Sequence, residues 1–203
     1  MVRSPEAAAV DEIFARRVEP IEELGADAEQ VARTCLSMAR RFHRGGKLIV
    51  FGSGGPSTDA QHVAVEFVHP VIVGKRALPA VSLTSDVATV TGVATGAGVD
   101  EVFAHQLRYL ARAEDIALGI STDGDDGAVL RGLREGARRG LLAVALVGGS
   151  GGAIAEAGFD HVLVARSDDP RVVKEVHVTT YHVLWELVHV FLDSPAVLGE
   201  EAA

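Results

Sequence analysis

Residues 47–69 read KLIVFGSGGPSTDAQHVAVEFVH. An apolar run, KLIVF, is followed by a glycine-rich turn and then by a segment with the apolar spacing of a helix. A strand, a tight turn and a helix in this order are typical of an α/β protein. The turn has the context in which backbone N–H groups and a helix N-terminus hold an anion. It matches neither the GxGxxG dinucleotide fingerprint nor the GK[ST] phosphate loop, so a plain strand-to-helix turn is an equal alternative.

The same alternation continues along the chain. Short apolar runs predict strands at 47–51, 79–84, 115–120, 141–147 and 160–165. Helical spacing lies between them, at 57–69, 86–94, 100–112, 125–139 and 151–157. Continuous Val, Leu and Ile runs predict strands buried on both faces, so we expect an α/β fold with a doubly wound, five-stranded parallel sheet. Ligands of such sheets bind beyond the carboxyl ends of the strands, here in loops 52–58, 84–86, 121–126 and 148–152.

Helices are also predicted outside this alternation. Residues 5–19 and 26–44 precede the first strand, with Pro20 and Gly25 marking the break between them, and a long helix at 170–193 follows the last strand. We therefore expect one domain over residues 1–195. Its parts are N-terminal helices (1–45), an α/β core (46–169) and a C-terminal helix (170–193), before a frayed tail (196–203).

Composition excludes several classes of function. The formal net charge of −9 argues against an extended nucleic-acid surface. Cys35 is the only cysteine, so neither an intrachain disulfide nor a Cys-based zinc cluster can form, and a small buried apolar role is expected for it. No stretch of 18 or more apolar residues predicts a membrane span. Acidic residues interrupt the N-terminus at Glu6, Asp11 and Glu12, which argues against a signal peptide and favours a cytoplasmic protein.

Two groups of residues carry candidate chemistry. His62 and Glu66 lie one helical turn apart, so both side chains can reach one metal ion or one proton, although an ordinary helix surface is the default explanation of such an isolated pair. The loop at 121–126 reads STDGDD. Its hydroxyls can hold a phosphate, whereas its carboxylates repel one, by roughly 1 to 4 kcal/mol per charge pair at about 4 Å. Capping of the following helix is the alternative role for these acids.

Six stretches together resemble the sugar isomerase (SIS) fold. They are FGSGGPSTDAQHVAVEF, ALPAVSL, VFAHQL, LGISTDG, VALVGGSGG and KEVHVTTYHVLWEL. They are most similar to the phosphoheptose isomerase family and to its non-enzymatic relative, the DnaA-binding initiator-associating protein. The resemblance covers the chain from the N-terminal helices to about residue 192. It implies a flavodoxin-like five-stranded parallel sheet and a homotetramer with active sites between subunits.

The resemblance also implies a reaction. Phosphoheptose isomerases convert sedoheptulose 7-phosphate to D-glycero-D-manno-heptose 7-phosphate, with a Glu and a His moving protons between C1 and C2. By position, Glu66 would be the base and His182 the partner acid or base. Zinc, which some members hold with two His, a Glu and a Gln, would use His62, Glu66 and His182. The implied substrate-binding residues are Ser53, Gly54, Gly55, Ser121, Thr122, Asp123, Asp126 and Lys174.

The chain departs from the family pattern where substrate would bind. Lys174 replaces the Gln ligand, and a protonated lysine cannot coordinate a metal. Pro56 replaces a serine and removes a hydroxyl and an N–H, while Ser53 replaces an asparagine. Asp123 and Asp126 replace two serines of the phosphate loop. An Asn-Asp pair of the family corresponds to Thr95-Gly96.

These observations favour a phosphoheptose isomerase-like protein that binds a sugar or sugar phosphate and isomerises an aldose and a ketose. The retained His62, Glu66 and His182 support this hypothesis. The altered phosphate loop leaves two alternatives. One is a non-catalytic SIS-domain scaffold or regulator with a protein partner, and the other is a sensor that binds sugar phosphate without chemistry.

Overall fold

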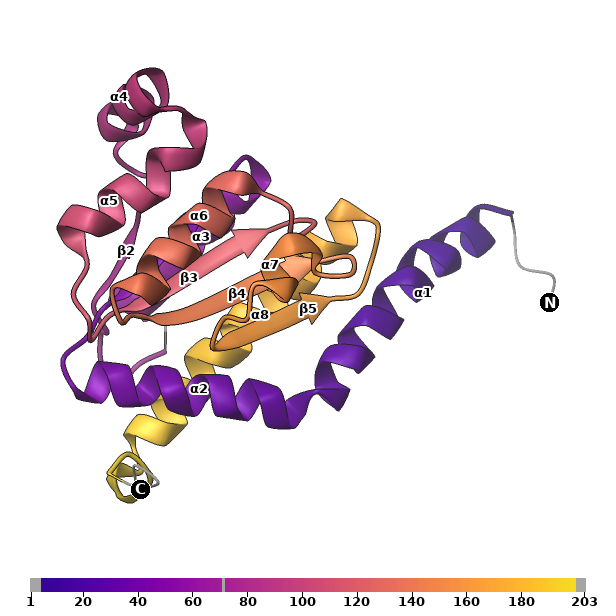
Figure 1. Ribbon diagram of the computed structural model, residues 1–203. Coiled ribbons are helices and arrows are strands. Elements are labelled where there is room, and N and C mark those ends of the chain that lie inside the picture. Colours follow the sequence, from indigo (N-terminus) through magenta and orange to yellow (C-terminus); the bar gives the residue numbers. More distant parts are fainter. Residues whose placement is uncertain (1–4, 71, 200–203) are drawn as a thin grey trace.

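The computed structural model describes residues 5–70 and 72–199. Its centre is a parallel sheet of five strands in the order β2-β1-β3-β4-β5, which confirms the predicted fold class (Figure 1). The strands are β1 (Leu48–Gly52), β2 (Ala80–Ser82), β3 (Ile116–Ser121), β4 (Leu142–Gly148) and β5 (His161–Ala165). All residues of β1, β3 and β4 are buried, as expected for strands covered on both faces.

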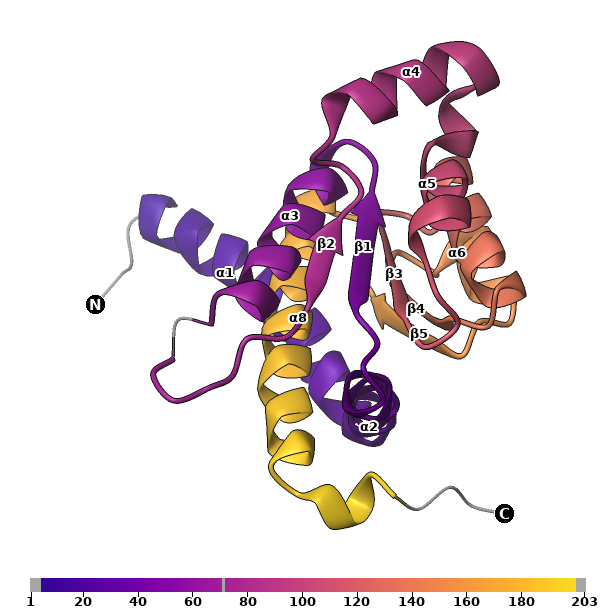
Figure 2. The ribbon, with the colours of Figure 1, turned by 90° about the vertical axis from the view of Figure 1, so that its left-hand side faces the viewer.

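Helices cover both faces of the sheet. They are α1 (Pro5–Ala26), α2 (Ala28–His43), α3 (Gly55–Val68), α4 (Val87–Ala97), α5 (Val102–Leu110), α6 (Gly127–Arg138), α7 (Gly152–Glu156) and α8 (Pro170–Leu192). Figure 2 shows α3 and α8 on one side and α5 and α6 on the other. Because side chains alternate along a strand, Leu48 and Val50 join the core beneath α2, α3 and α8, while Ile49 and Phe51 join the core beneath α5, α6 and α7.

The start of α8 is fixed by local sequence. The Asp169 side chain accepts a hydrogen bond from the Arg171 N–H at 3.0 Å, and Pro170 occupies the first helical turn. An acidic cap followed by proline is a strong helix start, because the cap satisfies a free N–H and proline lacks one. Local sequence therefore determines the residue at which α8 begins.

The predicted break at Pro20 and Gly25 was wrong. Helix α1 continues through both residues to Ala26, and the chain changes direction at Asp27, before α2 (Figure 1). Proline removes one helical hydrogen bond. Pro20 is itself buried and Leu24 packs against the core, so packing of this stretch offsets that loss.

The tail was also mispredicted in part. Residues Pro195–Val197 form a 3₁₀ turn, and Leu198 is buried in the core beneath α2 and α8. Leu198 is an apolar residue that packing anchors, so the chain is not frayed up to this point. Residues 200–203 lie outside the described part of the chain.

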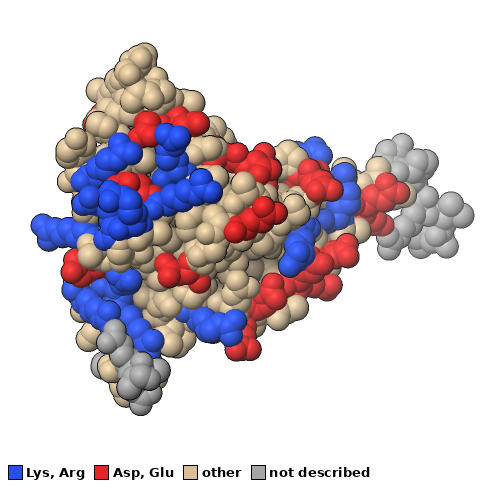
Figure 3. All heavy atoms as spheres, viewed as in Figure 1, with Lys and Arg blue, Asp and Glu red and all other residues tan. Residues whose placement is uncertain are grey.

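A charged patch lies on the surface of the helices that cover one face of the sheet. Lys and Arg side chains gather over α5 and α6 (Figure 3), where Glu101 pairs with Arg108 and Arg131, and Glu135 pairs with Arg138.

The side chain of Cys35 is buried, and burial raises the pKa of its thiol to about 12, which fits an inert core residue. Over the described residues, the search for a helix long and apolar enough to cross a membrane found none.

A substitution at Gly148 can test how tightly β4 packs against the loop that contains Thr122. A methyl group on Gly148 would collide with the Thr122 carbonyl oxygen and with Val173 of α8. We expect Gly148→Ala to lower the free energy of unfolding by about 1–3 kcal/mol, measured by urea denaturation. Gly92→Ala in α4 is the matched control, because nothing lies within 4 Å of its added methyl group. Equal stability of the two variants would show that the loop at Thr122 can move away from β4.

Candidate active site

The sheet has a switch point between β1 and β3. The two strands are neighbours, with Gly52 paired in register with Ile120, but β1 continues into α3 on one face and β3 into α6 on the other. The loops after β1 and β3 therefore diverge at the carboxyl edge of the sheet, which is where ligands of such folds bind. Gly54 has a φ of 63°, a left-handed conformation that favours glycine, and it turns the chain into α3.

A cavity of about 200 Å³ opens between these loops. It brings together five of the predicted substrate-binding residues, Ser53, Ser121, Thr122, Asp123 and Asp126, and it is also lined by Pro56 and Asp125. Of the described residues that line this cavity, none is a lysine or arginine. Its polar character is therefore acidic.

The carboxylates of this loop are already hydrogen-bonded within the protein. Asp126 accepts from the Val129 N–H at 2.9 Å and caps α6, as the capping hypothesis predicts. Asp125 accepts from the Ala153 N–H at 2.8 Å, at the start of α7. Asp123 accepts from the Asp125 N–H at 2.9 Å and from the Ser121 hydroxyl at 3.2 Å. The loop thus uses its own acids to satisfy N–H groups within the loop and at the starts of α6 and α7.

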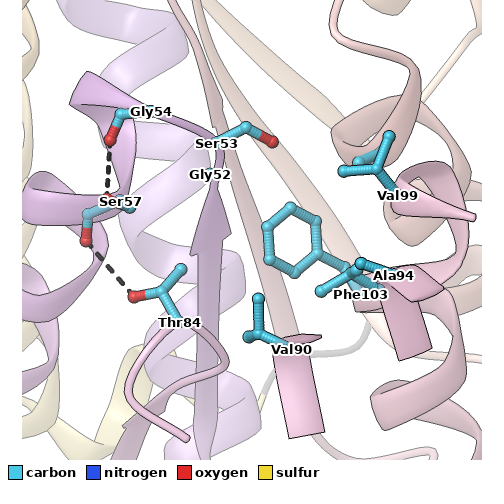
Figure 4. Close-up of a pocket in the computed structure, with 11 residues that line it drawn as sticks. Gly52, Ser53, Gly54, Ser57, Thr84, Val90, Ala94, Val99 and Phe103 are labelled. Carbon is cyan, nitrogen blue, oxygen red and sulfur yellow. Dashed lines mark hydrogen bonds between the residues drawn. The ribbon is translucent and has the colours of Figure 1, made fainter. Parts of the chain in front are cut away.

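A second, apolar cavity of about 300 Å³ adjoins the glycine turn (Figure 4). Ser53 and Gly54 line one side, and Val90, Val99 and Phe103 line the other. Helix α4, which contributes Val90, projects from the domain and has no buried residue, so this wall stands apart from the core (Figure 1). Of the remaining predicted residues, Gly55 begins α3 and Lys174 lies on α8.

The structure assembles His62, Glu66 and His182 on facing sides of α3 and α8. One possible ligand atom from each residue lies within 4.8 Å of those of the other two. His62 Nε2 is 3.2 Å from Glu66 Oε1, and the rings of His62 and His182 are 5.3 Å apart between centroids. Glu66 is partly buried and His182 is exposed. A carboxylate and two imidazoles at this spacing can move protons or bind a divalent metal.

Tyr181 joins this group from α8. Its side chain is buried, and its hydroxyl lies 2.8 Å from His62 Nδ1. Burial raises the pKa of Tyr181, and the negative charges of Asp59 and Glu66 raise it further. The phenol therefore remains protonated at neutral pH, where it can donate a hydrogen bond.

Lys174 of α8 lies beside the first turns of α3, where it contacts Thr58 and Asp59. Its Nζ donates to Asp59 Oδ1 at 2.7 Å and to Thr58 Oγ1 at 3.0 Å. The Asp59 side chain is only 5% exposed, whereas that of Lys174 is 46% exposed. Lys174 therefore acts as the counter-ion of a buried carboxylate, a role that the sequence did not suggest.

Two other histidines of α8 have structural contacts. His189 is buried and lies 2.8 Å from the Trp185 carbonyl and 3.1 Å from the Arg76 carbonyl. His177 is buried next to the sheet, and burial lowers its pKa. Neither belongs to the group formed by His62, Glu66 and His182.

Asp59 and Tyr181 are the site residues that sequence reasoning missed. Asp59 lies three and seven residues before His62 and Glu66, which is the spacing of one stripe of a helix. Tyr181 lies seven residues after Lys174 on α8, with the same periodicity. Helical periodicity places Asp59 on the same face as His62 and Glu66, and Tyr181 on the same face as Lys174. Only the structure shows that these two helical faces meet.

Comparisons with known proteins identify the family. The family model for the SIS domain matches residues 12–148. The phosphoheptose isomerase of Desulfovibrio desulfuricans is 38% identical over 165 residues, which cover 81% of this chain and 78% of that protein. That of Pelobacter propionicus is 36% identical, with 89% and 90% covered. The chain belongs to the phosphoheptose isomerase family of SIS-domain proteins.

Solved structures of the phosphoheptose isomerase family agree with this assignment. The structure from Francisella tularensis has a TM-score of 0.85 at 29% identity and covers 92% of this chain and 100% of its own. The structure from Neisseria gonorrhoeae has a TM-score of 0.82 at 29% identity, with 90% and 97% covered. The fold and the family predicted from the sequence are both confirmed.

The ion pair between Lys174 and Asp59 can be tested by stability. Lys174→Gln would leave a buried carboxylate without its counter-ion, so we expect the free energy of unfolding to fall by about 1–3 kcal/mol. Adding Asp59→Asn should recover most of this loss, because it removes the unpaired charge. Lys75→Gln is the control, since its partner Asp193 is 71% exposed and exposed pairs contribute little. No recovery in the double variant would mean that Lys174 stabilises the fold without its partner.

Proposed function

We propose that this chain is an aldose–ketose isomerase that acts on a sugar or sugar phosphate. The observation that carries this proposal is the assembly of His62, Glu66 and His182 from two helices into one group. The names of its relatives, which are phosphoheptose isomerases, point to the same class of reaction. Nothing observed favours the non-catalytic scaffold over this function.

The proposed mechanism is a proton transfer through an enediol. Glu66 removes a proton from the carbon next to the substrate carbonyl, and the electron pair of that C–H bond forms the carbon–carbon double bond. The carbonyl oxygen takes up a proton, for which His182 is the nearby acid. The neighbouring hydroxyl gives up its proton to become the new carbonyl, and a proton is returned to the former carbonyl carbon. No atom is gained or lost, as isomerisation requires.

The substrate would extend from this group towards the glycine turn. Residues 55–62 of α3 separate the two, which corresponds to about 10 Å along the helix at 1.5 Å per residue. The far end of the sugar would enter the cavity lined by Ser53, Thr122 and Asp126. The acids of this cavity repel a dianion, which favours an unphosphorylated sugar. The relatives are named for a sugar phosphate, so the proposed substrate class includes both kinds of sugar.

Zinc stays a prediction. Zn²⁺ in catalytic sites takes three protein ligands of His and carboxylate type, and His62, Glu66 and His182 would hold it. When bound, it would polarise the substrate carbonyl as a Lewis acid. Both nitrogens of His62 have hydrogen-bond partners, and zinc would have to displace one of them. Lys174, which stands where the family pattern has a glutamine ligand, pairs with Asp59 and is not a fourth ligand. The steps described above use only protein groups.

Glu66→Gln tests the proton transfer. Glutamine keeps the shape of the side chain but cannot accept the proton, so we expect kcat to fall by about a hundredfold to ten-thousandfold. Turnover should be measured with sedoheptulose 7-phosphate and with unphosphorylated sedoheptulose, and binding by thermal shift. Glu114→Gln is the matched control, because Glu114 is exposed just before β3, at the opposite edge of the sheet.

Three outcomes separate the functions. Turnover lost in Glu66→Gln but kept in Glu114→Gln supports the proposed mechanism. Turnover that survives in Glu66→Gln contradicts it. A wild-type protein that binds sugar but turns over neither substrate would favour the non-catalytic alternative.

We also propose that the chain forms a homotetramer. One stripe of α1 exposes Val10, Ile13, Phe14, Val18 and Ile21, with Phe14 66% exposed. It is continuous with an apolar groove of about 290 Å³ lined by Ile21, Leu24, Val183 and Leu187. Apolar surfaces of this kind are typical of protein interfaces, and a second copy of the chain is the occupant that the family resemblance implies.

Solution mass tests the assembly. Size-exclusion chromatography with light scattering should give about four times the chain mass of 21.3 kDa. Phe14→Asp should reduce this mass, because it places a charge in the apolar stripe. A wild-type protein that runs as a monomer would contradict the proposal.

A further inference from the structure

The imidazole of His62 is held at both of its ring nitrogens. Nδ1 lies 2.8 Å from the Tyr181 hydroxyl, and Nε2 lies 3.2 Å from Glu66 Oε1. The rings of His62 and Tyr181 meet edge to face, with centroids 5.3 Å apart. Tyr181 is 1% exposed, so packing fixes the position of its hydroxyl.

These two contacts favour one position for the proton of the neutral imidazole. A neutral imidazole has one nitrogen that donates a hydrogen bond and one that accepts. Within the described residues, His62 Nδ1 is the hydrogen-bond partner of the Tyr181 hydroxyl, so this buried O–H has an acceptor only if Nδ1 is unprotonated. The proton is then on Nε2, where it faces the Glu66 carboxylate. The opposite tautomer would leave the hydroxyl proton without an acceptor and would place two lone pairs against each other.

We propose that Tyr181 is a positioning residue of this site. By donating to His62 Nδ1, it holds the imidazole in the Nε2–H tautomer and aims that proton at Glu66 Oε1. The hydrogen bond fixes the orientation of the carboxylate and leaves its second oxygen free to take the substrate proton. The effect on turnover rests on the isomerase function proposed above, whereas the tautomer does not.

The arrangement has a consequence for metal binding. A histidine binds a metal through an unprotonated nitrogen, and the tautomer is set by the hydrogen bond at the other nitrogen. With Nδ1 accepting from Tyr181, Nε2 carries a proton, so zinc could bind His62 through Nε2 only after this proton had moved to Nδ1. Tyr181 therefore favours His62 as a hydrogen-bond donor to Glu66 and weakens zinc binding at this group by the free-energy cost of changing the tautomer.

The tautomer can be measured directly. Two-dimensional ¹⁵N spectra of histidine side chains distinguish the protonated from the unprotonated ring nitrogen. They should be recorded at about pH 8, above the usual pKa of histidine. The signal of His62 is assigned by its loss in His62→Gln. We expect the Nε2–H tautomer in the wild type and a shift towards the Nδ1–H tautomer in Tyr181→Phe. Tyr109→Phe is the matched control, because Tyr109 is the other tyrosine of the chain and is 77% exposed.

Kinetics and zinc affinity give two further readouts. In Tyr181→Phe we expect kcat to fall about tenfold with KM nearly unchanged, because the base is misaligned while the sugar contacts remain. Zinc affinity, measured by competition with a chromogenic chelator, should rise severalfold, because Nε2 is released as a ligand. Tyr109→Phe should change neither.

The proposal and the isomerase function fail in different ways. An Nδ1–H tautomer in the wild type overturns the role of Tyr181 without any variant having to fold. A zinc affinity that falls in Tyr181→Phe also overturns it, because the hydroxyl would then be accepting from Nδ1–H and supporting the metal. The expected tautomer together with an absence of turnover in the wild type would uphold the role of Tyr181 and reject the isomerase.

Discussion

Helices α3 and α8 pack against each other on one face of the sheet, and the candidate catalytic group depends on this contact. His62 and Glu66 come from α3, and Tyr181 and His182 come from α8. The contact is built on buried apolar residues such as Val63 and Phe67 of α3 and Leu184 of α8. Packing of this kind holds helices at fixed separation and rotation, so the polar side chains beside it are held in register.

The polar contacts between the two helices divide into two parts. Near the start of α3, Lys174 neutralises the buried Asp59. Farther along, Tyr181 holds His62, which in turn contacts Glu66. A buried charge or hydroxyl is costly without a partner, so each contact helps to define the alignment of the helices. Two residues that depart from the family pattern also have specific partners: Lys174 pairs with Asp59, and Asp126 accepts from the Val129 N–H.

The loop at residues 121–126 is also held by contacts within the protein. Asp123, Asp125 and Asp126 accept hydrogen bonds from the protein's own N–H groups. These bonds stabilise the loop and connect it to α6 and α7. The same three acids make the cavity acidic.

The sequence by itself determined the strand and helix segments, the parallel sheet, and the candidates His62, Glu66 and His182, because hydrophobic periodicity and helical spacing are local properties. It mispredicted the join at Pro20 and part of the tail, where packing outweighs local propensity. Only the tertiary structure decided which helical faces meet. The partners of His62 and Lys174 lie 119 and 115 residues away in the chain, and no local pattern specifies contacts across such a separation. The packing of α3 on α8 specifies them.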